Sequence, residues 1–266
     1  KITFENNYNK TPIRKYKADS HNQEGAVEIF SLPQIDKVTN KPFRERYIAG
    51  IDPIDNDYVK NGSLGSIFIF DLWNDEIVAE YTGRPQLAED FYEICMKLLL
   101  FYNAQGNYES NIRGLFGYFS NKNMLHLLSD TPTILRDIES HKMSLSGSVS
   151  KGTRSVTSNI NEGLRLQKSW MSQKISRINI INDEEVETTT SKLREIKSLG
   201  YIEELFEYTP DGNFDRIMAM NMVMFLRQER YRFIEREIEE KKYIEADDFF
   251  RENYDDIFED DDKYYN

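Results

Sequence analysis

Asp52 ends a short apolar run, Tyr47 to Ile51, that has the pattern of a strand buried on both faces. Pro53 and the polar stretch behind it stop this strand at the carboxylate. A carboxylate at the end of a buried strand is strongly disfavoured unless hydrogen bonds, a cation or a metal compensate its charge. Asp52 is therefore a candidate for chemistry; the ordinary alternative is an aspartate that only caps a turn.

Two further carboxylates have defined places in the predicted elements. Glu109 follows a predicted strand, and Asp215 lies in the first turn of a Met-rich helix that runs from Ile217 to about Arg232. Two divalent metals about 3.5 to 4 Å apart need such a set of oxygen ligands, one of them shared. We predict that Asp52, Glu109 and Asp215 are catalytic and hold two ions, Mg²⁺ or Mn²⁺. The alternatives are a turn at Glu109 and a plain helix N-cap at Asp215.

An α/β pattern must bring these residues together. Three strands form a predicted antiparallel meander, an amphipathic helix follows, and the next strand contains Glu109. A strand that follows a helix in this order returns parallel to an earlier strand by a right-handed crossover. If it lies beside the first strand, Glu109 and Asp52 emerge at the same edge of the sheet. The meander strands are predicted at 47–52, 66–71 and 77–81, and the helix at 87–102.

The second half of the chain is harder to assign. We predict a helix at 161–173, a fifth short strand at 177–181, a helix at 183–199, and an edge strand or hairpin arm at 201–208. The predicted domains are a linker or N-terminal arm at 1–46, an α/β domain at 47–234 and an acidic C-terminal extension at 235–266. The first residue is Lys rather than Met, which we interpret as the start of a fragment of a longer parent chain.

Composition limits the possible chemistry. The net charge is −12, but about 14 acidic and 5 basic residues lie after position 234, so the remaining body is close to neutral and can carry a local basic face. One cysteine excludes Cys-rich metal sites, and three scattered histidines make a histidine-built zinc site a poor interpretation. No apolar run has the roughly 18 to 20 residues of a membrane span. A bound metal would be held by oxygen.

Three motifs, taken in order, resemble one known family. Ile48-Ala-Gly-Ile-Asp52 resembles a first-strand aspartate motif, and Asn107-Tyr-Glu-Ser-Asn111 is similar to a fourth-strand Glu-x-Asn motif. Asn213-Phe-Asp-Arg-Ile-Met-Ala219 is similar to a His-Asp-Asp-x-Val-x-Ala motif at the start of the last helix. The chain thus resembles, from about 47 to 226, the C-terminal nuclease domain of the large terminase subunit of tailed bacteriophages, which has a ribonuclease-H-like fold.

The resemblance implies a role. It places Asp52, Glu109 and Asp215 on the family's metal ligands and implies a two-metal endonuclease that cuts concatemeric double-stranded viral DNA during genome packaging. The implied fold is a mixed sheet, with strands one to three antiparallel and strands four and five parallel, flanked by helices. The implied partners are double-stranded DNA, an N-terminal packaging ATPase domain of the same parent chain, the capsid portal and the small terminase subunit. The implied location is the host cell cytoplasm during virion assembly, without membrane contact.

Two positions depart from the family pattern. Phe214 replaces the first aspartate of the usual pair, and Ser63 stands where many members have an aspartate at the start of strand two. A fourth carboxylate is then missing or is supplied by another residue, for which the candidates are Asp55, Asp57 and Asp211.

A cluster of basic residues provides candidate DNA contacts. Phosphate contacts of this kind set affinity without reading sequence, and an ordinary solvated face is the alternative. The candidates are Lys151, Arg154, Arg165 and Lys168. Two rival functions remain: a catalytically silent DNA-docking or portal-docking module of a packaging motor, and a resolvase-like or transposase-like nuclease of the same fold.

Overall fold

The computed structural model describes residues 2, 4–5, 10–14, 23–54, 63–135, 150–181 and 184–259, with only the backbone described for 177–186 and 239–259. The proposed auxiliary carboxylates Asp55 and Asp57 lie outside these ranges. The chain divides into two units, residues 1–227 and 228–266. The first unit contains the sheet and the predicted carboxylates.

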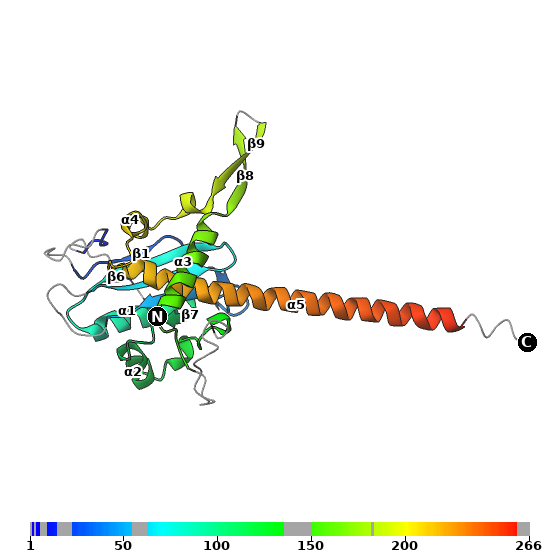
Figure 1. Cartoon of the computed structure of the whole chain (residues 1–266), viewed down its shortest axis with the longest axis horizontal. Helices are drawn as coiled ribbons and strands as arrows, with labels where there is room; N and C mark the ends of the chain where they lie inside the picture. The colour runs from blue at the N-terminus through cyan, green and yellow to red at the C-terminus, as the bar shows by residue number, and fades with distance from the viewer. Residues whose placement is uncertain are drawn as a thin grey trace, which may run out of the picture. The chain divides into compact units, whose positions relative to one another are not determined.

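A five-stranded mixed sheet forms the centre of the first unit (Figure 1). Its strand order is β1-β6-β5-β4-β7, and β4 pairs parallel with β7 while the other neighbours pair antiparallel. The antiparallel and parallel pairing within one sheet confirms the mixed α/β sheet that the sequence predicts. The strands are β1 Val27–Ile29, β4 Tyr47–Asp52, β5 Gly65–Asp71, β6 Glu76–Gly83 and β7 Gln105–Tyr108; β2 Ile35–Asp36 and β3 Lys41–Pro42 form a separate small pair.

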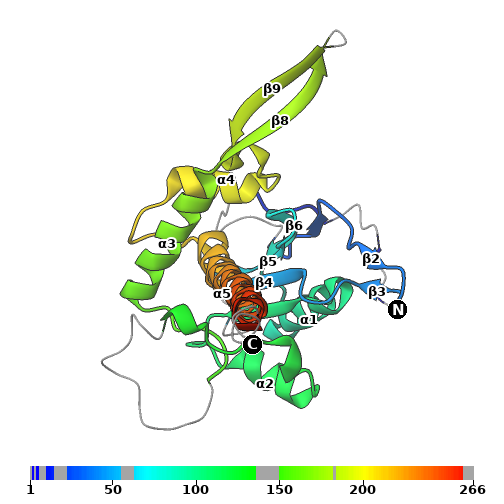
Figure 2. The same ribbon diagram turned by 90° about the vertical axis from the view of Figure 1, so that its right-hand side faces the viewer.

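Helices cover both faces of the sheet, as Figure 2 shows. On one side lie α1 (Ala88–Tyr102) and α2 (Gly114–Asn121); on the other lie α3 (Thr157–Met171) and the first turns of α5 (Asp215–Glu259). The apolar residues form two buried clusters, one for each face. The remaining elements are α4 Leu199–Glu207 and three short 3₁₀ helices, η1 Leu125–Leu127, η2 Thr133–Leu135 and η3 Lys192–Glu195.

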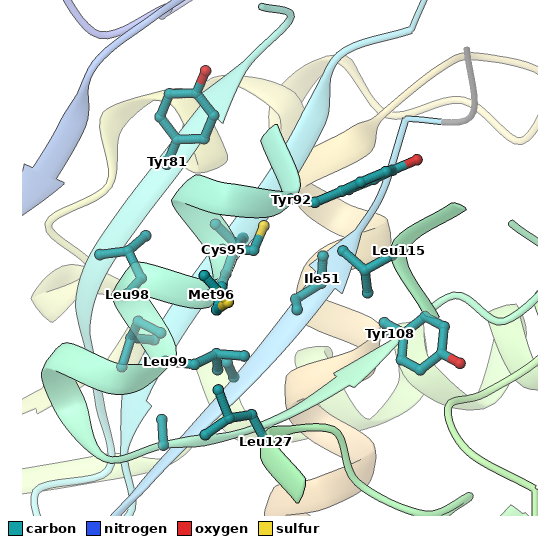
Figure 3. Close-up of a cluster of buried hydrophobic side chains, with 14 of the residues drawn as sticks. Ile51, Tyr81, Tyr92, Cys95, Met96, Leu98, Leu99, Tyr108, Leu115 and Leu127 are labelled. Carbon is teal, nitrogen blue, oxygen red and sulfur yellow. The ribbon is translucent and has the colours of Figure 1, made fainter. Parts of the chain in front are cut away.

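The first cluster fixes the strand ends that precede the two predicted catalytic carboxylates. Ile51, one residue before Asp52, is fully buried, and Tyr108, one residue before Glu109, is 3% exposed. Figure 3 shows both side chains in the cluster that α1 covers, together with Leu99 and Leu127. A close-packed core resists shifts of its side chains. The packed cluster therefore holds the backbone of both strand ends, and with it the two carboxylates, in place.

Gly50 allows α5 to approach β4 unusually closely. A Cβ atom at this position would collide with the carbonyl oxygen of Ala219 and the amide nitrogen of Val223. Asp52 lies two residues further along the strand, and Asp215 lies one helical turn before Ala219. The close packing of helix on strand thus brings Asp215 toward the strand end.

Three details differ from the sequence prediction. The predicted strand at 177–181 exists, but it belongs to β8 (Lys174–Ile181), which pairs with β9 in a separate hairpin; the fifth strand of the central sheet is β1. The helix predicted at 183–199 is wrong, because the β-branched run of Val186 and three threonines forms β9 (Glu184–Ser191). The edge strand predicted at 201–208 is also wrong and is helix α4, whose N-cap Ser198 accepts a hydrogen bond from the amide of Tyr201.

The second unit continues α5 beyond Arg227 to Glu259. Among the described residues, no helix is both long enough and apolar enough to span a bilayer. All 14 acidic residues that follow position 234 belong to this unit.

Candidate active site

Asp52 and Glu109 leave adjacent parallel strands at the same edge of the sheet. Ile51 pairs with Tyr108 in the β4–β7 register, and the Glu109 amide donates a hydrogen bond of 3.1 Å to the Ile51 carbonyl. The Asp52 side chain is only 7% exposed. The juxtaposition expected from the strand, helix, strand order is thereby confirmed.

The surroundings of Asp52 favour its neutral form. Burial, then the negative charges of Asp215 and Glu109, raise the pKa of Asp52 well above its ordinary value. A hydrogen bond between the Asp52 and Glu109 carboxyl groups acts in the same direction, because it requires a shared proton. No side chain of the described ranges forms a salt bridge with Asp52. An ionised Asp52 therefore needs a cation that the described part of the chain does not itself provide.

Asp215 is the first residue of α5 and is 5% exposed. Its Oδ2 accepts a 3.1 Å hydrogen bond from the Leu64 amide, and its Oδ1 accepts one from the Ser63 hydroxyl. Burial raises the pKa of Asp215, while the donors Ser63 and Leu64 oppose this shift. At Ser63 the resemblance implied a lost carboxylate. The Ser63 hydroxyl instead donates a hydrogen bond to Asp215 and orients it.

A fourth carboxylate, Glu204 of α4, also faces this region. Its Oε2 accepts a 3.0 Å hydrogen bond from the Arg216 amide, and its Oε1 accepts one of 3.0 Å from the Arg216 guanidinium. The negative charge of Glu204 contributes to the raised pKa of Asp52, and the charge of Asp215 contributes to the raised pKa of Glu204. Burial raises the pKa of Glu204 itself to about 7, against the opposing charge of Arg216.

Sequence reasoning missed Glu204 because it assigned residues 201–208 to a strand. A helical period would have placed Glu204 three residues after the fully buried Tyr201 and hence on the same inward face. The Ser-x-x-Tyr start with its serine N-cap is the signal that was available.

Arg216 and Glu80 complete a compensated cluster beside these carboxylates. Both side chains are 1% exposed, and the Arg216 Nε lies 2.5 Å from Glu80 Oε1. Glu80 also accepts hydrogen bonds from Ser198 at 2.5 Å and Thr82 at 3.1 Å. The Arg216 charge is thus shared between Glu80 and Glu204. This arginine cannot fully neutralise Asp52, Glu109 and Asp215 as well.

The donor set suits an oxygen-ligated divalent cation in charge and in chemistry. The charges of Asp215 and Glu109 both act on Asp52, and the basic residue that acts on Asp215, Arg216, is already paired with Glu80 and Glu204. Mg²⁺ and Mn²⁺ prefer such oxygen ligands. In the same ranges, no three His, Cys, Asp or Glu side chains are grouped so that they could hold a metal ion as they stand.

Two solved structures that are similar to this chain are of the same phage protein. The crystal structure of the large terminase nuclease from thermophilic phage G20c is 11% identical, with a TM-score of 0.29, over 73% of this chain and 91% of that chain. The structure of the same nuclease with bound magnesium is 12% identical, with a TM-score of 0.30, over 74% and 92%. No protein-family model and no curated protein matches the sequence. Superpositions this weak do not define a function, which must be argued from the residues themselves.

Asn111 of the Glu-x-Asn pattern contacts Glu109. Its Nδ2 lies 3.2 Å from Glu109 Oε1 and 3.3 Å from the Ser155 carbonyl, so the amide links Glu109 to the loop that precedes α3. Glu109 itself pairs in a parallel β-bridge with Thr153 of that loop. The orientation of Glu109 is therefore set from both sides.

The predicted DNA contacts lie in different environments. Arg154 and Lys168 are exposed and form no ion pair with a described side chain. Lys151 binds the Leu128 carbonyl at 2.8 Å and Asp130 at 3.0 Å, and Arg165 is bound through two nitrogens to Glu162. Arg154 and Lys168 are consequently the better candidates for phosphate contact.

Asp211 and Phe214 lie in different environments. Asp211 is exposed in the turn that precedes α5, and no described contact links it to the three carboxylates. Phe214, where the resemblance implied an aspartate, packs its ring 5.1 Å from that of Tyr208.

Proposed function

We propose that this chain is a divalent-metal-dependent endonuclease that hydrolyses phosphodiester bonds of double-stranded DNA. The observation that carries this proposal is the uncompensated negative charge of Asp52 and Glu109 at the ends of adjacent parallel strands, with Asp215 close enough to raise the pKa of Asp52. A site that holds three carboxylates without a cation is costly to fold. It becomes favourable once cations bind.

The residues of this chain have separable roles in the proposed site. Asp52 and Glu109 supply the negative charge, and Asn111 orients Glu109 through its 3.2 Å hydrogen bond. Ser63 and the Leu64 amide orient Asp215 and favour its ionised form. Two divalent ions bound here would activate a water molecule and stabilise the leaving oxygen of the phosphodiester.

Substrate contact is assigned to the loop and helix next to Glu109. Thr153 pairs with Glu109, so the exposed Arg154 guanidinium is carried by the segment that flanks the carboxylates. A guanidinium matches two oxygens of a phosphate group. We assign Arg154 as the first phosphate contact and Lys168 of α3 as the next.

The biological setting is proposed from the motif resemblance alone. It is genome packaging of a tailed phage in the host cytoplasm, with an ATPase domain of the same parent chain, the portal and the small terminase subunit as partners. Double-stranded DNA concatemers would be the substrate.

A nicking assay on supercoiled plasmid tests the catalytic proposal. Wild-type protein with Mn²⁺ or Mg²⁺ should convert supercoiled plasmid to nicked and linear forms, and EDTA should prevent it. Asp52→Asn and Glu109→Gln remove charge without changing shape, so each should lower the cleavage rate at least about 100-fold, as expected when a ligand of a catalytic metal is lost.

Glu89→Gln provides the matched control, because Glu89 is an exposed acid in the first turn of α1. It should cleave within twofold of wild type. Plasmid left intact by wild type, or equal cleavage by Asp52→Asn and wild type, would overturn the proposal.

A catalytically silent docking module is the second candidate, and one observation favours it. Both oxygens of Asp215 accept hydrogen bonds from Ser63 and Leu64, and no three-ligand group is formed in the described ranges. In that case wild-type protein would bind duplex DNA without cleaving it, and Mn²⁺ would not change its melting temperature.

A further inference from the structure

The β8–β9 hairpin has a base that is fixed to the body of the first unit. The Lys192 amide, directly after β9, donates a 2.9 Å hydrogen bond to the Gln173 carbonyl, directly before β8. The Lys192 ammonium reaches the Asn74 carbonyl at 3.3 Å and lies 3.8 Å from Asp75. Figure 2 shows the hairpin continuing beyond the C-terminal end of α3. Side chains at this base therefore have a defined position relative to α3.

A cavity of about 350 Å³ opens at this hairpin base. Every lining residue carries a hydroxyl group or a positive charge, and no carboxylate is among them: Ser172, Lys174, Thr189, Thr190, Ser191 and Arg194. Lys174 and Arg194 are exposed and form no ion pair with a described side chain. Hydroxyl donors beside an ammonium and a guanidinium match the oxygens of a phosphate group.

The exposed face of α3 leads from the carboxylates to this cavity. Ser158, Asn161, Arg165 and Lys168 are exposed and spaced three or four residues apart, so they lie on one face of the helix. Ser172 continues the same spacing into the cavity. Thr153, four residues before the helix, pairs with Glu109. The N-terminal end of α3 thus begins beside the proposed active site.

The length of this face suits a DNA backbone. α3 has 15 residues, or roughly 22 Å at about 1.5 Å per residue. One strand of duplex DNA carries a phosphate about every 3.4 Å along the axis, so the face spans roughly six phosphates. Its charge lies at the ends, because Glu162 compensates Arg165 in the middle. Arg154 is at one end, and Lys168 with the cavity is at the other.

We propose that the cavity at the hairpin base binds the phosphate backbone of duplex DNA that lies along α3, at the end of the helix remote from Asp52 and Glu109. The inference rests on the proposed function for the identity of the ligand. It adds a second anchoring point, which would hold the duplex in line with the site of cleavage.

Duplex binding without catalysis tests this inference. Fluorescence anisotropy with a 20-base-pair duplex in EDTA, over a series of salt concentrations, measures affinity and the number of phosphate contacts. Lys174→Ala/Arg194→Ala should weaken binding roughly tenfold at 0.1 M salt. It should also reduce the slope of log K against log salt by about 2, since each lost phosphate contact contributes about 0.9.

Arg44→Ala/Lys122→Ala is the matched control. It also removes one arginine and one lysine, both exposed, from the β3–β4 turn and the end of α2. Its affinity should lie within about twofold of the wild-type affinity. Its salt slope should differ from the wild-type slope by less than about 0.5, on the order of the scatter of such measurements. Lys174→Arg/Arg194→Lys keeps both charges and should retain at least half of the wild-type affinity.

The outcomes separate this inference from the proposed function. If wild type binds the duplex and the double alanine variant binds equally well, or loses no more than the control, the cavity proposal is overturned while the nuclease proposal stands. If wild type cleaves no plasmid but the double alanine variant still loses DNA affinity selectively, the cavity proposal stands and the nuclease proposal fails. Absence of wild-type binding overturns the cavity proposal, and the plasmid assay then decides the nuclease proposal.

Discussion

Two buried charged clusters lie near the start of α5, and they differ in how their charge is balanced. In one, the Arg216 guanidinium lies between Glu80 and Glu204, at 2.5 Å and 3.0 Å. In the other, the charges of Asp215 and Glu109 raise the pKa of Asp52, and no basic side chain of the described ranges pairs with Asp52. Neighbouring residues, Asp215 and Arg216, belong to different clusters.

This difference separates a structural arrangement from the proposed functional one. Buried ions in folded proteins are usually paired, because an unpaired buried charge costs several kcal/mol. The Arg216 cluster follows that rule and secures α4, α5 and β6 to one another. The Asp52 cluster breaks it at the ends of β4 and β7, where Asp52 is buried and Glu109 is half-buried. The exception is the better guide to function.

Removal of Arg216 should have the largest effect on stability. Arg216→Met leaves Glu80 and Glu204 buried without their cation, so the free energy of unfolding should fall by about 3 to 5 kcal/mol. Urea unfolding followed by circular dichroism measures this change. Arg165→Met, which breaks the exposed pair with Glu162, should cost less than about 1 kcal/mol. Similar losses in the two variants would contradict the structural role assigned to Arg216.

Asp52→Asn should have the opposite sign in metal-free protein. Since Asp52 has a raised pKa in the folded chain, the folded state holds its proton more tightly than the unfolded state, and stability is lost as pH rises from about 4 through the raised pKa. Asparagine carries no charge to lose. At pH 8 in EDTA the variant should therefore be more stable than wild type by roughly 1 kcal/mol, and the gap should shrink toward pH 5.

Thermal melting with Mn²⁺ completes this experiment. Wild-type protein should melt at a higher temperature when Mn²⁺ is added, because ligand binding to the folded state stabilises it. Asp52→Asn should show little of this increase. A variant that is less stable than wild type at pH 8 in EDTA would show that Asp52 is already compensated in the metal-free chain, and the contrast between the two clusters would disappear.

The sequence predicted one cluster and missed the other for identifiable reasons. Asp52 and Glu109 follow apolar strands in a strand, helix, strand order, and a right-handed crossover allows few alternatives. Glu204 and Arg216 are recognisable only once α4 is known to be a helix, and the short apolar pattern at 201–208 also suits a strand. Glu80 lies within β6, where its burial depends on Arg216, 136 residues away. Pairing over such separations leaves no local pattern.

Ser63→Ala should have the smallest effect on stability. It tests the contact that Ser63 makes with Asp215, the residue next to Arg216 of the other cluster. The Ser63 hydroxyl donates to Asp215 and favours its ionised form, so its loss should raise the pKa of Asp215 further and weaken its use as a ligand. Stability should change by about 1 kcal/mol or less, as for one hydrogen bond.

Cleavage should fall roughly tenfold with the loss confined to lower pH, since Asp215 still ionises at higher pH. The pH profile of plasmid nicking measures this, with Ser120→Ala, an exposed serine of α2, as control. A uniform loss at every pH would mean that Ser63 acts on the site by some route other than the charge of Asp215.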